Sequence, residues 1–342
     1  MNPRAFVVSR VESGRTVAAV LHARLALSWS VARRLVEGGW VRVGHTVCQD
    51  AAQRVKPGQR LEVRRPAERT RDRDARRRPS DQMARPRGDA TTPEHKRPAP
   101  VIRYADAHVV VVEKPAGMTT MRHAHEAAEF GRRAQRFLPP TLADLLPGLL
   151  ATAMRPRPRV RAVHRLDKDT SGLVVFAQTP AAERSLGLQF RAHSTGRRYL
   201  AVVRGRATPG RIESYFVTDR GDGRRGSSPA PGAGKRAVTN VRVLEQLGDF
   251  TLVECRPETG RTHQVRIHLG ERGTPICGEQ VYDRPPHGPP LPDTSGAPRL
   301  ALHAAELAFD HPATGKRMTW TSPLPGDLTA LVSNLRKRAK GQ

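Results

Sequence analysis

Residues 64–100 divide the chain, because this stretch cannot contribute to a folded core. It holds twelve Lys or Arg, six Asp or Glu and six Pro, and apart from proline its only apolar side chain larger than alanine is Met83. Such a segment cannot bury enough apolar area to offset the entropy lost on ordering its backbone. The sequence therefore predicts four parts: an N-terminal module over 1–64, a disordered basic linker over 65–100, a large domain over 101–335 and a basic tail over 336–342.

The chain is more basic than solubility requires. Lys and Arg number 59 against 32 Asp and Glu, which gives a formal net charge of +27. This balance predicts a polyanionic partner, and nucleic acid fits better than a membrane, because the sequence shows neither a basic amphipathic helix nor an apolar run long enough to span a bilayer. The N-terminus lacks the apolar region of a signal peptide, and three scattered cysteines form no disulfide or zinc pattern. We therefore expect a cytoplasmic protein.

The N-terminal module reads as a small α+β unit. Apolar spacing predicts a helix over 16–27, and a second helix follows over 31–39, ended by two glycines. Residues 40–47 alternate like a β-hairpin with Gly44 at the turn, and 55–63 read as a Pro-Gly turn that leads into a strand.

The large domain is rich in strands. Six β-branched runs bounded by turn residues are found at 108–117, 171–179, 198–205, 237–247, 250–258 and 262–270. The best helix candidates among them are 142–150 and 181–190. This order predicts an α+β fold: a large mixed, mainly antiparallel sheet flanked by helices and loops, rather than a doubly wound parallel sheet.

The stretch HRLDKDTSG, at 164–172, concentrates charge just before a predicted strand. An ionised carboxylate in such a loop can act as a nucleophile or a base. Asp is equally common as a turn or capping residue, and spacing alone favours that interpretation for both Asp167 and Asp169.

A second charged stretch, ETGRTHQVRIHLG at 258–270, contains Arg261, His263, Arg266 and His268. Cations gathered on so short an element can hold a phosphate or a catalytic carboxylate, or can simply form a solvated basic face. The two histidines are five residues apart, which differs from the four-residue spacing of metal-binding helices. We expect no metal site.

Two further residues have two interpretations each, and a third has one. Tyr199 lies in an apolar strand and could stack on a base or pack in the core. Lys114 ends a buried-looking strand and could contact a phosphate or only terminate the strand. Leu302 opens another strand and by itself indicates core.

The motifs VVVVEKPAGM, HRLDKDTSGLVVF, RRYLAVV, GRTHQVRIH and LALHA, in this order, resemble the RluA-type pseudouridine synthase family. The resemblance spans roughly residues 101–325. The N-terminal module resembles, more loosely, the S4-type RNA-binding domain. It departs from the usual pattern at its hairpin, where Gly44-His45 stands in place of an Asn-Gly turn.

The resemblance implies roles for individual residues. Asp167 matches the catalytic aspartate, Tyr199 the aromatic residue that stacks on the flipped base or handles a proton, and Arg266 the cation that ion-pairs with the aspartate. Asp169 falls where the family motif does not demand Asp. Residues implied as pocket or RNA contacts are His164, Arg165, Arg261, His263 and Leu302, and those implied as RNA contacts of the N-terminal module are Arg33, Arg34 and Arg42.

The resemblance therefore implies an isomerase that converts specific uridines of structured RNA to pseudouridine. Large-subunit ribosomal RNA is the expected substrate, ahead of transfer RNA. The reaction transfers no electrons, so we expect no cofactor and no metal, and we expect a monomer. The alternative from another class is a catalytically inactive RNA-binding ribosome-assembly factor on the same fold.

Overall fold

The computed structural model describes residues 4–12, 14–25, 27, 31–32, 35–36, 38–50, 53–63, 99–122, 140–151, 159–228, 230, 232–285 and 288–341. The chain forms two compact units, 1–96 with 218–225, and 97–217 with 226–342. The linker predicted over 65–100 lies outside the described residues up to residue 98, so the predicted domain boundaries stay predictions.

The first unit contains a four-stranded antiparallel sheet in the order β1-β4-β2-β3. Its described elements are β1 (Arg4–Val7), a 3-10 turn (Arg10–Glu12), α1 (Val17–Leu25), β2 (Val41–Val43), β3 (Thr46–Cys48) and β4 (Arg60–Val63). Gly44, with φ of 63°, makes the hairpin turn between β2 and β3, as predicted. Apolar residues of α1 and the sheet, among them Leu21 and Leu61, are fully buried and form the core of this unit.

The second unit contains an eleven-stranded sheet. Its strands are β5 (Val101–Ala105), β6 (Val109–Lys114), β7 (Arg161–Ala162), β8 (Ser171–Ala177), β9 (Gly196–Arg204), β10 (Gly210–Val217), β11 (Gly226–Ser227), β12 (Lys235–Leu247), β13 (Phe250–Pro257), β14 (Leu302–Asp310) and β15 (Arg317–Thr321). The order is β11-β10-β12-β13-β9-β14-β8-β6-β5, with β15 on β14 and β7 on β8. The β8–β14 pair is parallel and the other pairs are antiparallel, which confirms the predicted mixed, mainly antiparallel sheet.

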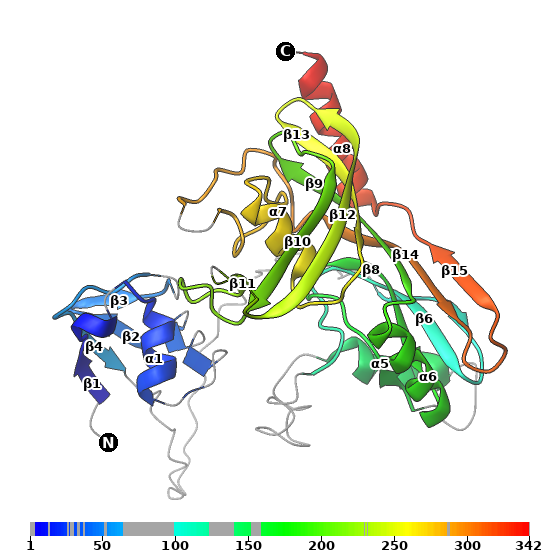
Figure 1. Ribbon diagram of the computed structural model, residues 1–342, viewed down its shortest axis with the longest axis horizontal. Helices are drawn as coiled ribbons and strands as arrows, with labels where there is room; N and C mark the ends of the chain where they lie inside the picture. The colour runs from blue at the N-terminus through cyan, green and yellow to red at the C-terminus, as the bar shows by residue number, and fades with distance from the viewer. Residues whose placement is uncertain are drawn as a thin grey trace, which may run out of the picture. The chain divides into compact units, whose positions relative to one another are not determined.

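Helices flank this sheet, as predicted. The described ones are α5 (Leu142–Ala151), α6 (Pro180–Arg191), α7 (Gln264–Glu271) and α8 (Gly326–Lys340). Helix α6 packs on β8 and β14, α7 packs on β12 and β13, and α8 packs on β12. In Figure 1, α5 and α6 lie near β6, while α8 lies near β13 and ends at the C-terminus. Helix α8 runs through most of the predicted basic tail, 336–342.

The strand predicted over 262–270 is wrong, because residues 264–271 form helix α7. Val265, Ile267 and Leu269 alternate with polar residues and so imitate a strand, yet α7 is short and buried on most sides. The side chain of Gln264 fixes the helix: Oε1 accepts hydrogen bonds from the Thr259 hydroxyl and the Arg261 backbone N–H, and Nε2 donates to the Val238 carbonyl. These tertiary contacts override the local pattern.

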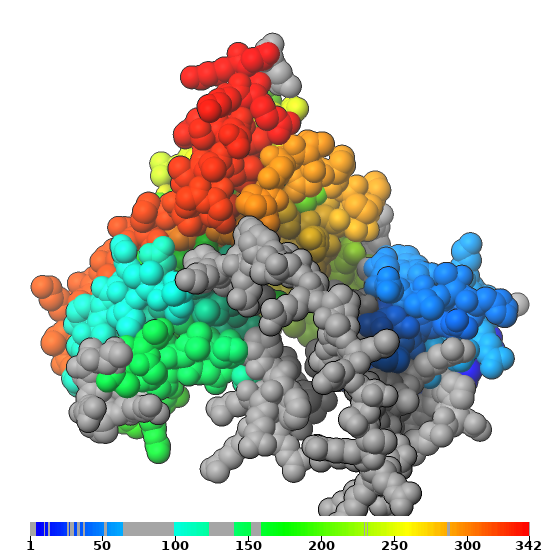
Figure 2. All heavy atoms as spheres, turned by 180° about the vertical axis from the view of Figure 1, so that it is seen from behind, coloured from blue at the N-terminus to red at the C-terminus, as the bar shows by residue number. Residues whose placement is uncertain are grey.

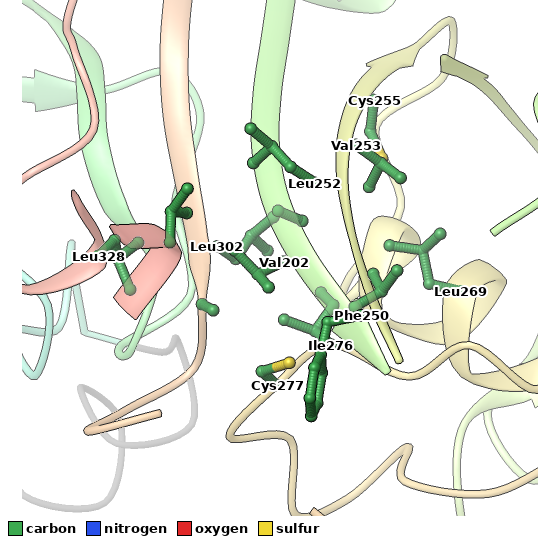
Figure 3. Packing of buried hydrophobic residues seen from close by; sticks show 14 of the residues in the cluster. Val202, Phe250, Leu252, Val253, Cys255, Leu269, Ile276, Cys277, Leu302 and Leu328 are labelled. Carbon is green, nitrogen blue, oxygen red and sulfur yellow. The ribbon is translucent and has the colours of Figure 1, made fainter. Parts of the chain in front are cut away.

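The largest apolar cluster joins the sheet to two helices. Val202 of β9 and Leu252 of β13 lie between Leu328 of α8 and Leu269 of α7 (Figure 3), and each of the four is at most 8% exposed. Leu302, at the start of β14, belongs to the same cluster. This packing holds β9 and β14, which carry candidate site residues, in fixed positions.

Residues 272–299 are attached to α8. In the view from behind, the orange surface of this segment adjoins the red surface of the C-terminal helix (Figure 2). Arg299 forms an ion pair with Asp327, with Nε 2.6 Å from Oδ2, and Arg338 donates to the Thr294 carbonyl. The segment is thereby held beside the sheet although its described residues form no helix or strand.

Gly172 is required where β8 meets β14. Its φ is +116°, and a Cβ there would lie 2.3 Å from the Ala304 carbonyl oxygen. We expect Gly172→Ala to lower the free energy of unfolding by about 3 kcal/mol, measured by urea denaturation followed by circular dichroism. Gly315→Ala is the matched control, because Gly315 also has positive φ but open space around its Cα. Equal losses in the two variants would show that the clash contributes nothing.

Two buried histidines make the second unit sensitive to acid. His268 and His303 are at most 1% exposed, and each ring forms hydrogen bonds with two hydroxyl groups. The partners of His268 are Ser214 and Thr239, and those of His303 are Ser171 and Ser322. Burial lowers the pKa of each to about 4. Their contribution to stability is therefore complete above the unfolded-state pKa near 6.5 and falls as the pH drops toward 4.

Between pH 7 and pH 5, each of these histidines should lower the free energy of unfolding by about 2 kcal/mol. Buried carboxylates such as Glu279, whose pKa is lowered, lose stability only at more acidic pH, so the two effects separate. The measurement is urea denaturation at pH 7, 6 and 5. A free energy of unfolding that stays constant over this range would contradict the assignment of neutral, buried histidines.

Candidate active site

A cavity of about 660 Å³ in the second unit gathers the residues that the sequence singled out. Its lining includes all eight candidates of the large domain: His164, Arg165, Asp167, Tyr199, Arg261, His263, Arg266 and Leu302. These residues come from the β7–β8 loop, β9, the β13–α7 loop, α7 and the start of β14. Of the N-terminal candidates, Arg42 lies half-buried on β2, and Arg33 and Arg34 lie outside the described residues.

The loop that carries Asp167 is fixed from two sides. On one side, Leu166 is 3% exposed, and its backbone N–H and carbonyl both bond to the Thr120 hydroxyl. On the other side, the ammonium of Lys114 donates to the Lys168 carbonyl at 3.0 Å. The Thr170 N–H closes the turn onto the Asp167 carbonyl. Asp167 therefore extends from a rigid loop.

Lys114 is a structural residue of this loop. It is 0% exposed, and its ammonium donates to three carbonyls, those of Pro115, Met118 and Lys168. Burial lowers its pKa to about 7, against the opposing charges of Asp169 and then Asp167. The interpretation of Lys114 as a phosphate contact is therefore wrong.

Asp167 and Asp169 occupy different surroundings. Asp167 lines the cavity, with 17% of its side chain exposed, whereas Asp169 is exposed and does not belong to the lining. Arg266 Nη1 lies 3.2 Å from Asp167 Oδ2, which places the pair that the sequence resemblance implied. The structure therefore distinguishes two carboxylates that the local sequence left equivalent.

Arg266 is itself held by a second carboxylate. Its Nε and Nη2 donate to the two oxygens of Glu279 at 2.7 and 2.8 Å, and its guanidinium lies 5.3 Å from the centre of the Tyr282 ring. Burial opposes the charge of Arg266, yet the hydrogen bonds and charge of Glu279, together with Asp167, raise its pKa above the usual range. This bidentate pairing leaves Nη1 directed at Asp167.

Glu279 was missed by sequence reasoning. Its side chain is 1% exposed, and although burial raises its pKa, the Arg266 guanidinium holds that pKa below the usual value. Oε1 also accepts backbone N–H bonds from Gln280, Val281 and Tyr282. The stretch around Glu279 has no hydrophobic period or turn motif that would identify a buried acid, so only the tertiary structure shows its role.

His263 lies beside the aspartate without adding charge. It begins α7 in the left-handed region, with φ of 58°, and its Nδ1 shares a hydrogen bond with the Tyr282 hydroxyl at 2.8 Å. Nε2 lies 3.7 Å from Asp167 Oδ1. Burial lowers the pKa of His263 to about 4, so the ring is neutral near pH 7.

Tyr199 and Leu302 form an apolar part of the cavity wall. Tyr199 lies on β9 and packs against Ala304, and Leu302 is paired in register with Ala201. Burial raises the pKa of the Tyr199 hydroxyl, and Asp167 acts in the same direction. The phenol therefore keeps its proton at neutral pH and offers a flat apolar ring.

His164 braces the loop. Its Nε2 accepts the Val175 backbone N–H at 3.0 Å, its ring stacks on Phe190 at 4.3 Å, and burial lowers its pKa to about 3. Arg261 donates from Nε to the Arg236 carbonyl, which joins the β13–α7 loop to β12.

Comparison with known proteins finds two matching family models and similar sequences. A family model for RNA pseudouridylate synthase matches residues 108–271, and a model for the S4 domain matches residues 16–61. The chain is 38% identical over 249 residues to ribosomal large subunit pseudouridine synthase D of Zymomonas mobilis subsp. mobilis, covering 71% of this chain and 76% of the relative. The protein of the same name from Pseudomonas aeruginosa is 39% identical over 242 residues, covering 69% and 72%.

A solved structure shares the fold. Human RNA pseudouridylate synthase domain containing 4 matches with a TM-score of 0.54 at 24% identity, covering 69% of this chain and 93% of that one. None of the described helices is long and apolar enough to cross a membrane.

The fold and the matching family model define an isomerase that acts on uridine in RNA. The chain belongs to the RNA pseudouridylate synthase family and carries an S4 domain in its N-terminal unit. The family resemblance seen in the sequence motifs is thereby confirmed.

Proposed function

We propose that this enzyme isomerises specific uridines of large-subunit ribosomal RNA and that Asp167 starts the reaction. The observation that carries the proposal is the Asp167–Arg266 pair at 3.2 Å within a cavity that Tyr199 and Leu302 also line. The names of the relatives support large-subunit RNA as the substrate. An S4 domain and the net charge of +27 supply the affinity for RNA. A cytoplasmic location and a monomeric state remain predictions.

The reaction breaks the bond between uracil N1 and C1′, turns the base and joins C5 to C1′. The C5 proton leaves and N1 gains one, so the product is an isomer and no electron is transferred. A carboxylate can begin this reaction by attacking C1′, by attacking the base or by removing the C2′ proton. In each case Arg266 orients Asp167 through a charge-assisted hydrogen bond.

The uridine must leave the RNA stack to reach Asp167. Extruding a base costs a few kcal/mol and is easiest in loops. The Tyr199 ring offers a stacking surface that offsets part of this cost, and Leu302 supplies an apolar floor. Because the Tyr199 phenol retains its proton, it can handle the C5 proton only as a relay, passing its own proton to another acceptor as it takes that one.

The test is to map pseudouridines in cells with and without the protein and to repeat the conversion in vitro. Uridines modified only when the protein is present should lie in large-subunit ribosomal RNA. A transcript that carries such a uridine, tritiated at C5, should release tritium with the purified enzyme. Sites found only in transfer RNA would contradict the proposed substrate, and unchanged maps together with retained RNA binding would favour an inactive binding protein.

A further inference from the structure

The cavity holds far more positive charge than the Asp167–Arg266 pair requires. Among the described residues that line it are five arginines, at positions 165, 191, 197, 261 and 266, and a single carboxylate, Asp167. Arg266 already engages that carboxylate and Glu279. Among the described residues of the cavity wall there is no second acid to balance Arg191, Arg197 and Arg261, and such a concentration of one charge predicts an anionic ligand.

Arg197 is the most unusual of these cations. It lies half-buried on β9, and its Nε is buried without a hydrogen-bond partner among the described residues. Nη2 donates to the Thr259 carbonyl at 3.1 Å, and no described carboxylate forms an ion pair with the side chain. Burial accordingly lowers its pKa. A buried guanidinium without a counter-charge is costly unless a ligand supplies one.

The positive charge of Arg197 lowers the pKa values of two neighbouring histidines. The pKa of His164 is lowered by burial and then by Arg197. The pKa of His193, another lining residue, is lowered by burial, by Arg197 and by Arg261. The positive potential therefore extends over this end of the cavity, beside the stacked rings of His164 and Phe190.

The fold leaves space for the Arg197 guanidinium at one glycine. A Cβ at Gly260 would lie 2.9 Å from Arg197 Nη1, closer than real Cβ contacts allow. Gly260 precedes α7 and also lines the cavity. The glycine of the GRTHQ stretch thus permits the guanidinium to lie against the backbone of the β13–α7 loop.

Arg197 also lies at a suitable distance from Tyr199, the ring that is proposed to stack on the base. Arg197 and Tyr199 are two residues apart on β9, so their side chains leave the same face of the strand about 6.6 Å apart. Within one nucleotide, that separation is comparable to the distance from the base to a flanking phosphate.

We propose that Arg197 binds a phosphodiester that flanks the target uridine and so forms a phosphate subsite next to the base-binding cavity. This inference rests on the proposed function, because it takes RNA as the ligand. A phosphodiester would give the guanidinium the counter-charge that the described part of the protein lacks, through charge-assisted hydrogen bonds. Phosphate contacts of this kind position the RNA without reading its sequence.

The test combines an enzyme variant with a changed phosphate. The probe is a hairpin RNA that carries a uridine converted by the wild-type enzyme, made with a neutral methylphosphonate on the 5′ or the 3′ side of that uridine. One of the two replacements should lower kcat/KM of the wild type by about 10- to 100-fold. Arg197→Met should lose a similar factor on the unmodified hairpin and should lose nothing more on the methylphosphonate hairpin.

Two controls separate a direct contact from a general loss of charge or fold. Arg184→Met removes the same charge from an exposed position on α6 that does not line the cavity, and should change kcat/KM by less than about threefold. Gly260→Ala keeps every charge but displaces the Arg197 guanidinium, and it should reproduce the insensitivity to methylphosphonate even if Arg197→Met folds poorly.

Additive losses in Arg197→Met and the methylphosphonate hairpin, or a wild-type enzyme insensitive to both replacements, would overturn the subsite while leaving the isomerase intact. If the wild type converts no uridine at all, the proposed function fails instead. Methylphosphonate versions of an RNA hairpin that the protein binds then still test the subsite through filter binding, where the same pattern of losses is expected in the dissociation constant.

Discussion

Asp167→Asn should abolish the release of tritium from RNA with 5-tritiated uridine, whereas Asp169→Asn should retain most of the activity. The first substitution removes the carboxylate charge that lies 3.2 Å from Arg266 in the cavity, and we expect kcat to fall by at least about a thousandfold. The second changes an exposed side chain outside the cavity, and we expect less than a tenfold loss.

The comparison is informative because the two aspartates are chemically equal and only two residues apart. Asn at 167 keeps the volume of the side chain, so RNA binding measured by filter retention should stay within about threefold of the wild type. If both variants lost activity to the same degree, the loop as a whole would be responsible and the assignment of Asp167 would fail. Full activity of Asp167→Asn would exclude the carboxylate from the reaction.

The sequence predicted those parts of the fold whose signals are local. β-Branched runs bounded by turns identified β6, β8, β9, β12 and β13, because such strands are set by their own composition. Helix α7 was assigned wrongly because its alternating apolar residues imitate a strand, and its helical state depends on the contacts of Gln264 with Val238 and Thr259. Val238 lies 26 residues before Gln264, so this contact cannot be seen from a local pattern.

The residues of the site could likewise be predicted only where the local sequence carries a signal. The order of the motifs predicted that Asp167, Tyr199 and Arg266 belong to one active site, and the structure places all three at one cavity. Glu279 and Arg197 were not predicted as site residues, because nothing in the sequence around them distinguishes a buried charge from a surface charge. The role of Lys114 was left open for the same reason, since only its burial and its hydrogen bonds to three carbonyls show that it supports the loop.

Glu279→Gln should impair catalysis although Glu279 does not line the cavity. The substitution replaces one of the two oxygens that hold Arg266 and removes the charge that balances it. Arg266 is then free to turn toward Asp167, which disturbs the geometry of the pair. We expect kcat to fall by about 10- to 100-fold with little change in KM, because the RNA contacts remain. The free energy of unfolding should also fall by about 3 kcal/mol, since a buried guanidinium loses its partner.

A purely structural role for Glu279 makes a different prediction from a positioning role. Glu306→Gln is the control for lost stability, because Glu306 also pairs with an arginine, Arg198, at 3.0 Å, but Arg198, unlike Arg266, does not line the cavity. The double variant with Glu279→Leu and Arg266→Met removes both charges of the buried pair, so it should regain much of the stability lost by Glu279→Gln. It should nevertheless remain inactive, because nothing orients Asp167.

These outcomes are read from urea denaturation and from single-turnover tritium release, both measured well below the unfolding temperature. Recovery of activity together with stability in the double variant would show that Arg266 and Glu279 only support the fold. A Glu279→Gln enzyme with normal kcat would lead to the same conclusion. A lowered kcat in Glu279→Gln, together with a normal kcat in Glu306→Gln at a comparable loss of stability, would instead establish a chain of positioning from Glu279 through Arg266 to Asp167, in which an acid outside the cavity sets the geometry of the acid within it.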